Sequence, residues 1–182
     1  MLGGMFLLKA LGSRQNDWII LVVIGFIYLA DQITKLLVER NLCPFRSIPS
    51  TGPIQLVCTY NTGSAFGLFQ QHTNILILAS IVGLGVLFYI YWAYYMPRSL
   101  FRISLGLQLG GAFGNLLDRV LYGRVTDFIK IGPWPVFNVA DSAVVVGMII
   151  LVWLLAFPSR KAKERTSINE LFARSKIYGK FP

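Results

Sequence analysis

The chain is poor in charged residues, and acidic residues are the scarcest. Asp, Glu, Lys and Arg make up only 14% of its 182 residues, with eight acids against 17 Lys and Arg. A soluble domain carries about a quarter charged residues, so a water-soluble globule is excluded. A disordered chain is excluded as well, because 55% of the residues are hydrophobic and disorder requires low hydrophobicity. The sequence contains no internal repeat or low-complexity tract.

Long apolar runs take the place of the missing charge. A hydrocarbon core of about 30 Å needs roughly 20 helical residues. The third of these runs, residues 103–117, is short and rich in glycine. It can span the membrane only if its flanking charges lie at the interfaces or if neighbouring helices shield it. The first run is too long for a signal-peptide core and has no small-residue cleavage site, so we interpret it as a retained helix. We predict an all-α polytopic membrane protein with four transmembrane helices, at residues 18–38, 73–96, 103–117 and 136–157.

The positive charges predict how these helices are oriented. Eleven of the 17 Lys and Arg lie before the first run, between the second and third, or in the tail 158–182. Five lie in the loops 39–72 and 118–135. The positive-inside rule therefore places both termini in the cytoplasm and these two loops outside. The basic tail is expected to rest on anionic lipid headgroups. With no folded basic face, the net charge of +9 does not indicate nucleic acid as a partner.

The larger outer loop has the features of a small sheet at the membrane surface. Ile54–Tyr60 is rich in β-branched and aromatic residues, which is typical of a strand. Asn61–Gly63 then indicates a turn. Cys43 and Cys58 lie in the same loop. Outside the cytoplasm a disulfide between them is permitted, but two free thiols fit the sequence equally well.

Half of the eight acids lie at or near the outer ends of the predicted helices: Asp31, Asp118, Asp127 and Asp141. An ionisable residue inside a membrane is costly, so each is a functional hypothesis. Asp31 and Lys35 are spaced i, i+4 and share one helical face. We interpret them first as a structural pair that neutralises itself. The alternative is that the pair shapes the mouth of an active site.

The third run carries a packing pattern followed by a polar cluster. Small residues recur every fourth position, which predicts close helix–helix packing, at Gly106, Gly110 and Gly114. Asn115 lies one turn before Asp118 and Arg119 and is within reach of either. We predict a hydrogen-bonded cluster at the helix end, with a structural role.

Asp127 and Asp141 form a candidate pair from two different segments. Two close carboxylates share one proton because both cannot ionise cheaply. In aspartyl protease chemistry the ionised acid takes a proton from water, while the protonated acid hydrogen-bonds the scissile carbonyl. From spacing alone, it is simpler to interpret Asp127 as an ordinary loop acid and Asp141 as an acid at a helix N-terminus.

Five motifs, in order along the chain, resemble those of the bacterial lipoprotein signal peptidase family, signal peptidase II. They are DQITK (31–35), NTGSAFG (61–67), GGAFGNLLDR (110–119), VTDF (125–128) and FNVADSA (137–143). The tail 158–182 matches no motif of the family.

The resemblance implies an activity and a site. Asp127 and Asp141 would be the catalytic dyad of a membrane aspartic endopeptidase, lined or braced by Asn61, Gly63, Asn115, Arg119, Asn138 and Ala140. The family removes the signal peptide of a prolipoprotein just before a diacylglyceryl-modified Cys, and it uses no metal and no cofactor. Globomycin-type cyclic peptides block such sites.

The resemblance also implies an architecture and a location. The expected fold is one integral membrane domain, 1–182, with four helices and a small extracytoplasmic β-cradle. It would lie in the bacterial cytoplasmic (inner) membrane with the active site near the outer face, in contact with membrane lipid.

Two other classes compete with the protease interpretation. A transporter would use Asp31, Asp118 and Asp141 as a relay, but it would need polar residues through the membrane depth. Here the second helix is uncharged and the acids lie at one side. A structural membrane protein would use the acids only at helix ends and would tolerate Asp→Asn at both dyad positions. The Gly-x-Gly-Asp motif of presenilin-like proteases is absent.

Overall fold

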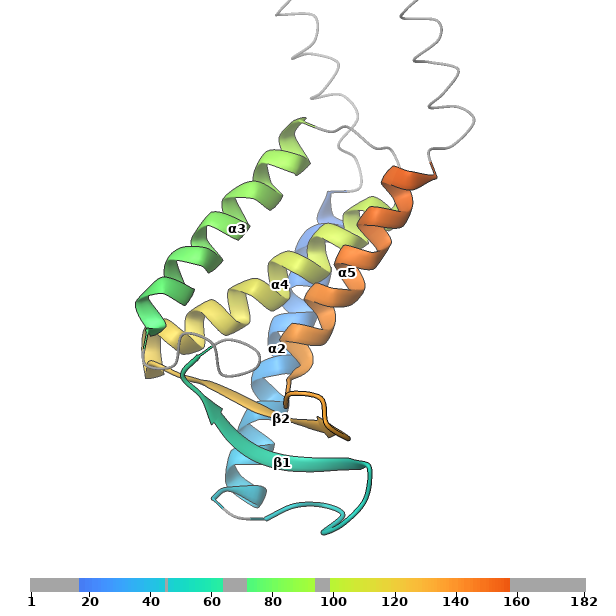
Figure 1. Ribbon diagram of the computed structural model, residues 1–182. Helices are drawn as coiled ribbons and strands as arrows, with labels where there is room; N and C mark the ends of the chain where they lie inside the picture. Colours follow the sequence, from blue (N-terminus) through green and yellow to red (C-terminus); the bar gives the residue numbers. More distant parts are fainter. Residues whose placement is uncertain (1–16, 45, 64–71, 94–98, 158–182) are drawn as a thin grey trace, which may run out of the picture.

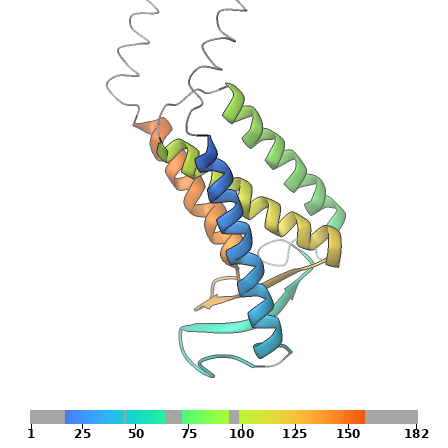
Figure 2. The ribbon, with the colours of Figure 1, turned by 180° about the vertical axis from the view of Figure 1, so that it is seen from behind.

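The computed structural model describes residues 17–44, 46–63, 72–93 and 99–157 (Figure 1). In chain order the elements are α2 (Trp18–Leu42), β1 (Ile54–Asn61), α3 (Thr73–Ala93), α4 (Ser99–Tyr122), β2 (Val125–Ile131) and α5 (Val139–Ala156). The strand pair lies at the end of the bundle where α2 extends beyond α4 and α5, and the reverse view agrees (Figure 2). The start of α2 and the end of α5 lie at the opposite end. The predicted cytoplasmic tail falls outside the described residues.

Three of the helices, α2, α3 and α5, are long and apolar enough to cross a membrane. None of the residues of α3 is buried within the chain. A helix that is apolar all round and unburied by protein requires an apolar solvent. The described part of the chain is therefore a mostly helical membrane protein with a small two-stranded sheet.

Helix α4 is the centre of the bundle and packs on α2, α3 and α5. Its predicted glycine stripe makes the close contacts. A Cβ on Gly106 would lie 2.7 Å from the Cβ of Val23, and one on Gly110 would lie 3.0 Å from the carbonyl oxygen of Ile24. Any side chain at these positions would push α2 and α4 apart. The predicted packing role of the stripe is confirmed.

Helix α4 is longer than the predicted 103–117, because its flanking charges are buried and paired. Arg102 and Asp118 are only 6% and 5% exposed. Arg102 Nε donates to Asp17 Oδ1 at 3.1 Å, and Lys35 pairs with Asp118 at 2.5 Å. A paired charge is far cheaper to bury than a single one. The helix is thus shielded by its neighbours rather than ended at the interfaces.

The ends of α2 and α5 also differ from the predicted bounds. Helix α2 continues to Leu42 instead of residue 38, since Val38 and Leu42 form a buried cluster with Phe128 of β2. Helix α5 starts at Val139 instead of residue 136. Its N-cap is Asn138, which forms a reciprocal capping box with the third helical residue.

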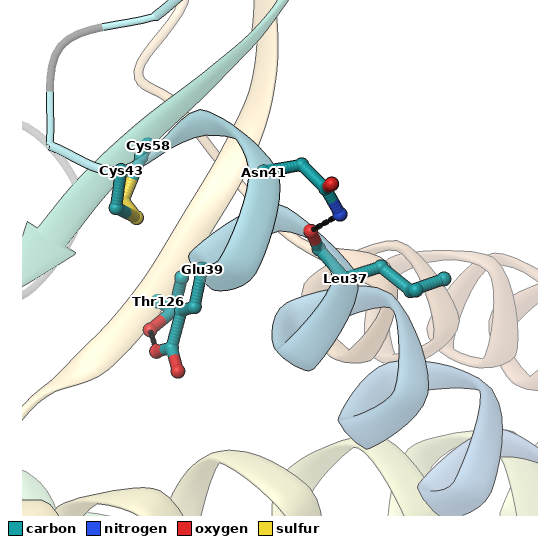
Figure 3. Close-up of a disulfide and its surroundings, with 6 residues drawn as sticks. All are labelled: Leu37, Glu39, Asn41, Cys43, Cys58 and Thr126. Carbon is teal, nitrogen blue, oxygen red and sulfur yellow. Dashed lines mark hydrogen bonds between the residues drawn. A yellow bond between two sulfur atoms is a disulfide. The ribbon is translucent and has the colours of Figure 1, made fainter.

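The sheet joins two loops that are far apart in the sequence. The predicted strand at 54–60 is confirmed as β1, which pairs antiparallel with β2. Strand β2 lies in the loop 118–135, where no strand was predicted. A strand is stabilised by its partner, and here the partner comes from the other outer loop. A disulfide joins Cys43, just after α2, to Cys58 in β1 (Figure 3). This settles the alternative that the sequence left open.

Candidate active site

The two candidate acids line one cavity of about 630 Å³. Asp127 lies in β2 and is 2% exposed. Asp141 lies in the first turn of α5, where the positive end of the helix dipole favours a carboxylate. A cavity of this size accommodates a ligand of several hundred daltons. The sheet and the helix bundle therefore contribute one acid each to a common site.

Asn138 connects the two acids. Its Nδ2 donates to Asp127 Oδ1 at 2.7 Å. Its backbone N–H donates to Asp141 Oδ2 at 3.2 Å, and its Oδ1 accepts from the backbone N–H of Asp141 at 2.9 Å. Asn138 reaches this position because the chain folds back after β2, so that Phe137 bridges to Ile129. The buried side-chain amide of Asn138 thus orients the carboxylate of Asp127, and its backbone N–H orients that of Asp141.

Asn61 and Gly63 approach Asp127 from the other side. Asn61 Nδ2 donates to Asp127 Oδ2 at 2.8 Å, while its Oδ1 accepts from the backbone N–H of Gly63 at 2.9 Å. The second bond closes the predicted turn. Gly63 is buried and is not among the residues that line the cavity. Its position orients Asn61, and Asn61 orients Asp127.

Burial raises the pKa of Asp127 to about 6. The hydrogen bonds from Asn61 and Asn138 act in the opposite direction, because they favour the ionised carboxylate, whereas the charge of Asp141 raises the pKa further. Removal from water therefore outweighs the two donors. A carboxyl group with this pKa can hold or release a proton near neutral pH.

A buried ion network lies behind the cavity. Lys35 Nζ is 2.6 Å from Asp31 Oδ2 and 2.5 Å from Asp118 Oδ2. It also donates to Asn115 Oδ1 at 2.9 Å. Asp31 in turn accepts from the backbone N–H of Ala140 at 3.0 Å. The predicted i, i+4 pair is confirmed, and it extends across α2, α4 and α5.

Asn115 belongs to both the ion network and the acid pair. Its Oδ1 accepts from Lys35 and from Asn138, and its Nδ2 donates to Asp141 Oδ1 at 2.8 Å. Ala140 lies behind the site rather than on the cavity wall, and it is fully buried. Asn115 and Ala140 therefore connect the charge of Lys35 and Asp31 to the start of α5.

Arg119 brings unused hydrogen-bonding capacity to the cavity. Its Nη1 donates to the backbone carbonyl of Asn115 at 3.3 Å. Its Nε is buried and has no hydrogen-bond partner within the described part of the chain. A buried donor in this state is costly unless something else accepts from it. Arg119 therefore lines the cavity and keeps one donor unsatisfied.

The opposite wall of the cavity is apolar and was not predicted from the sequence. It includes Trp134 and Val136, which precede α5, and Val144 on its second turn. No spacing or motif signals them, because they meet only when the chain folds back onto β2. The role of Asp118 as a second partner of Lys35 was missed too, although its position one turn after Asn115 was a usable signal.

Across the described ranges, no three His, Cys, Asp or Glu side chains are grouped to hold a metal ion.

A family model described as signal peptidase (SPase) II matches residues 23–157. The chain belongs to the signal peptidase II family. The resemblance drawn from the five motifs is therefore confirmed, and the chain is a protease of that family. The match covers all the described helices apart from the first turn of α2.

Curated relatives and solved structures agree with the family. A lipoprotein signal peptidase of Moorella thermoacetica is 40% identical over 131 residues, 71% of this chain and 87% of that protein. One of Dehalococcoides mccartyi is 43% identical over 148 residues, 78% and 90% of the two chains. A solved bacterial membrane enzyme aligns with a TM-score of 0.70 at 27% identity, over 75% of this chain and 87% of that one. This signal peptidase II therefore shares its fold with a known membrane enzyme.

Proposed function

We propose that this signal peptidase II removes the signal peptide from diacylglyceryl-modified prolipoproteins, cutting before the lipidated Cys. Asp127 and Asp141 are the catalytic dyad and activate a water molecule. The observation that carries the proposal is that the two acids come from different elements, line one cavity and both accept hydrogen bonds from Asn138, one from its side chain and one from its backbone. The names of the curated relatives, lipoprotein signal peptidases, support the substrate class.

The dyad works by sharing one proton. The ionised carboxylate accepts a proton from water as the water oxygen attacks the scissile carbonyl carbon. The protonated carboxyl group donates to the carbonyl oxygen, giving a neutral tetrahedral intermediate. Transfer of a proton to the leaving amide nitrogen then breaks the C–N bond and restores the dyad. A pKa of about 6 for Asp127 suits a group that must both hold and release a proton.

The other residues of the site bind or brace. Asn61 and Asn138 hold Asp127, and Asn115 holds Asp141. Arg119 binds a backbone carbonyl of the substrate through its free Nε. The apolar wall accommodates the signal peptide or acyl chain, and globomycin-type cyclic peptides are expected to occupy the same cavity.

We further propose that α4 is a fourth transmembrane helix. Its 24 residues span about 36 Å at 1.5 Å per residue, and its buried charges are paired. Both termini then lie in the cytoplasm, and the sheet and cavity lie at the outer face of a bacterial cytoplasmic membrane. The chain, 1–182, forms one integral membrane domain in contact with membrane lipid.

The test is a cleavage assay in detergent with diacylglyceryl-modified prolipoprotein. Asp127→Asn and Asp141→Asn should each lower kcat at least about a hundredfold, as expected when an acid–base group is lost. Glu170→Gln, in the tail, removes a carboxylate elsewhere and serves as the matched control. Unmodified prolipoprotein should be a poor substrate for the wild type. Full cleavage by either folded Asp variant would remove the dyad assignment.

A further inference from the structure

Strand β1 contains a one-residue bulge beside the active site. Leu56 pairs with Ile129, but Thr59 pairs with Asp127, so the register changes between these pairs. Two residues of β1, Val57 and Cys58, therefore lie opposite the single residue Phe128. A bulge of this kind moves every later side chain of the strand by one position relative to its partner.

The bulge decides what Asn61 faces. In the observed register Asn61 pairs with Val125, on the same face of the sheet as Asp127. Its amide then reaches Asp127 Oδ2 diagonally, at 2.8 Å. If the register of Leu56 continued without the bulge, Asn61 would lie opposite Arg124. Asn61 and Asp127 would then lie on opposite faces of the sheet.

Hydrophobic burial fixes β2, whose first four residues are buried, but it does not fix the register of β1 against it. A strand is held firmly in register when one of its faces is buried, but no residue of β1 is buried. A two-stranded ribbon is also only marginally stable by itself. Some other interaction must hold the bulge in place.

Two anchors on α2 hold the strands at the bulge (Figure 3). Thr126 of β2 donates a hydrogen bond to Glu39. Just after the end of α2, Cys43 forms the disulfide with Cys58, which is one of the two bulged residues. One anchor is a hydrogen bond to β2, and the other is a covalent bond to β1.

We propose that the Cys43–Cys58 disulfide is a positioning element of the active site, which fixes the bulge in β1 and so keeps Asn61 on Asp127. The proposal rests on the function proposed above for Asp127. It extends that function, because it predicts that the enzyme is fully active only in its oxidised form. The proposed location outside the cytoplasm permits such a bond.

Loss of the bond should change how the dyad titrates. The hydrogen bond from Asn61 favours the ionised form of Asp127, so without it the pKa of Asp127 is higher. Lys35 of α2, Arg119 of α4 and Asp141 of α5 also act on this carboxyl group, but none of them is attached to β1. The dyad then takes up its second, inactivating proton at a higher pH.

The experiment records kcat against pH for the purified full-length chain, untreated and after reduction with a phosphine. The phosphine supplies two electrons and water supplies two protons and one oxygen, so the disulfide becomes two thiols and the phosphine becomes its oxide. Reduction should move the acidic limb of the profile upward by on the order of one pH unit, a tenfold change in proton affinity. Reoxidation should move it back.

Three variants separate positioning from general stabilisation. Cys43→Ser with Cys58→Ser should show the shifted limb and no response to phosphine, because the chain has only these two cysteines. Asn61→Ala should show the shifted limb when oxidised, with no further shift on reduction. Reduction that lowers the melting temperature but leaves the limb in place would overturn the proposal. The proposal would also be overturned if reduction moved the acidic limb equally far in Asn61→Ala and in the wild type.

Failure of this proposal can be distinguished from failure of the proposed function. If the oxidised wild type cleaves and Asp127→Asn does not, an unmoved limb removes the role of the disulfide alone. If Asp127→Asn cleaves normally, the dyad assignment is removed, and the positioning role falls with it.

Discussion

Asn138 is the residue on which the geometry of the site depends most directly. It is completely buried, it caps α5, and it hydrogen-bonds both acids. A buried amide is stable only when its donors and acceptor are satisfied. Here Asp127 and Asn115 accept from Nδ2, and the backbone N–H of Asp141 donates to Oδ1. Asp127 gains a fixed orientation in return, at the cost of being removed from water.

That cost makes the stability of the protein depend on pH. The native carboxyl group of Asp127 keeps its proton up to about pH 6, against a usual pKa of 3.8. The free-energy penalty for ionising this buried carboxyl group is absent below pH 3.8 and grows as the pH rises to about 6. Above that pH the penalty is constant.

Asp127→Asn should therefore become more stable relative to wild type as the pH is raised from 4 to 7. The difference in free energy of unfolding should change by about 2 kcal/mol in favour of the variant. Denaturant unfolding in detergent at a series of pH values measures this difference. A difference that stays constant with pH would show that Asp127 is not desolvated in the native protein.

Among the elements, α4 and α5 make the tightest contact near the site. A Cβ built on Gly111 of α4 would lie 2.3 Å from the carbonyl oxygen of Ala140, which is the residue before Asp141. Backbone cannot yield as a flexible side chain can, so α5 would have to move. Close packing of the two helices and placement of the proposed catalytic acid Asp141 therefore depend on one glycine.

Gly111→Ala should destabilise the protein by about 1–3 kcal/mol, as overpacking typically does, and should also lower kcat because Asp141 is displaced. Gly25→Ala in α2 is the matched control, since its Cβ meets nothing within 4 Å. Alanine there should be neutral or stabilising by up to about 1 kcal/mol. Unfolding and cleavage measured on both variants test the contact, and equal behaviour would contradict it.

At the scale of the whole molecule, the site forms where the sheet meets the bundle. The start of α2 and the end of α5 lie at one end, and the sheet lies at the other (Figures 1 and 2). Asp127 belongs to β2 of that sheet, and Asp141 belongs to the first turn of α5. The distribution of Lys and Arg predicts how the whole bundle is oriented in the membrane.

Reporter fusions test this orientation. A reporter that is active only in the cytoplasm should be active when fused after Pro182. One that is active only outside should be active when inserted at the exposed turn 50–53, between α2 and β1. The opposite pattern of activity would contradict the proposed topology.

Much of this organisation follows from the sequence by itself. Apolar runs of the required length set three of the helices, and the glycine spacing set the packing face of α4. The i, i+4 spacing paired Asp31 with Lys35. These features are local, because they depend on residues within a few turns of one another. The five motifs are by themselves enough to identify the family.

Only the tertiary structure decided the remaining features, because each needs two distant segments to meet. Strand β2 forms because it pairs with β1. Helix α4 extends past its predicted ends because Asp17 and Lys35 neutralise the charges of Arg102 and Asp118. The disulfide and the bulge that it fixes depend on where β1 lies against α2. The sequence determined which acids the chain carries and predicts at which membrane face they lie, and the fold decided which of them share a cavity.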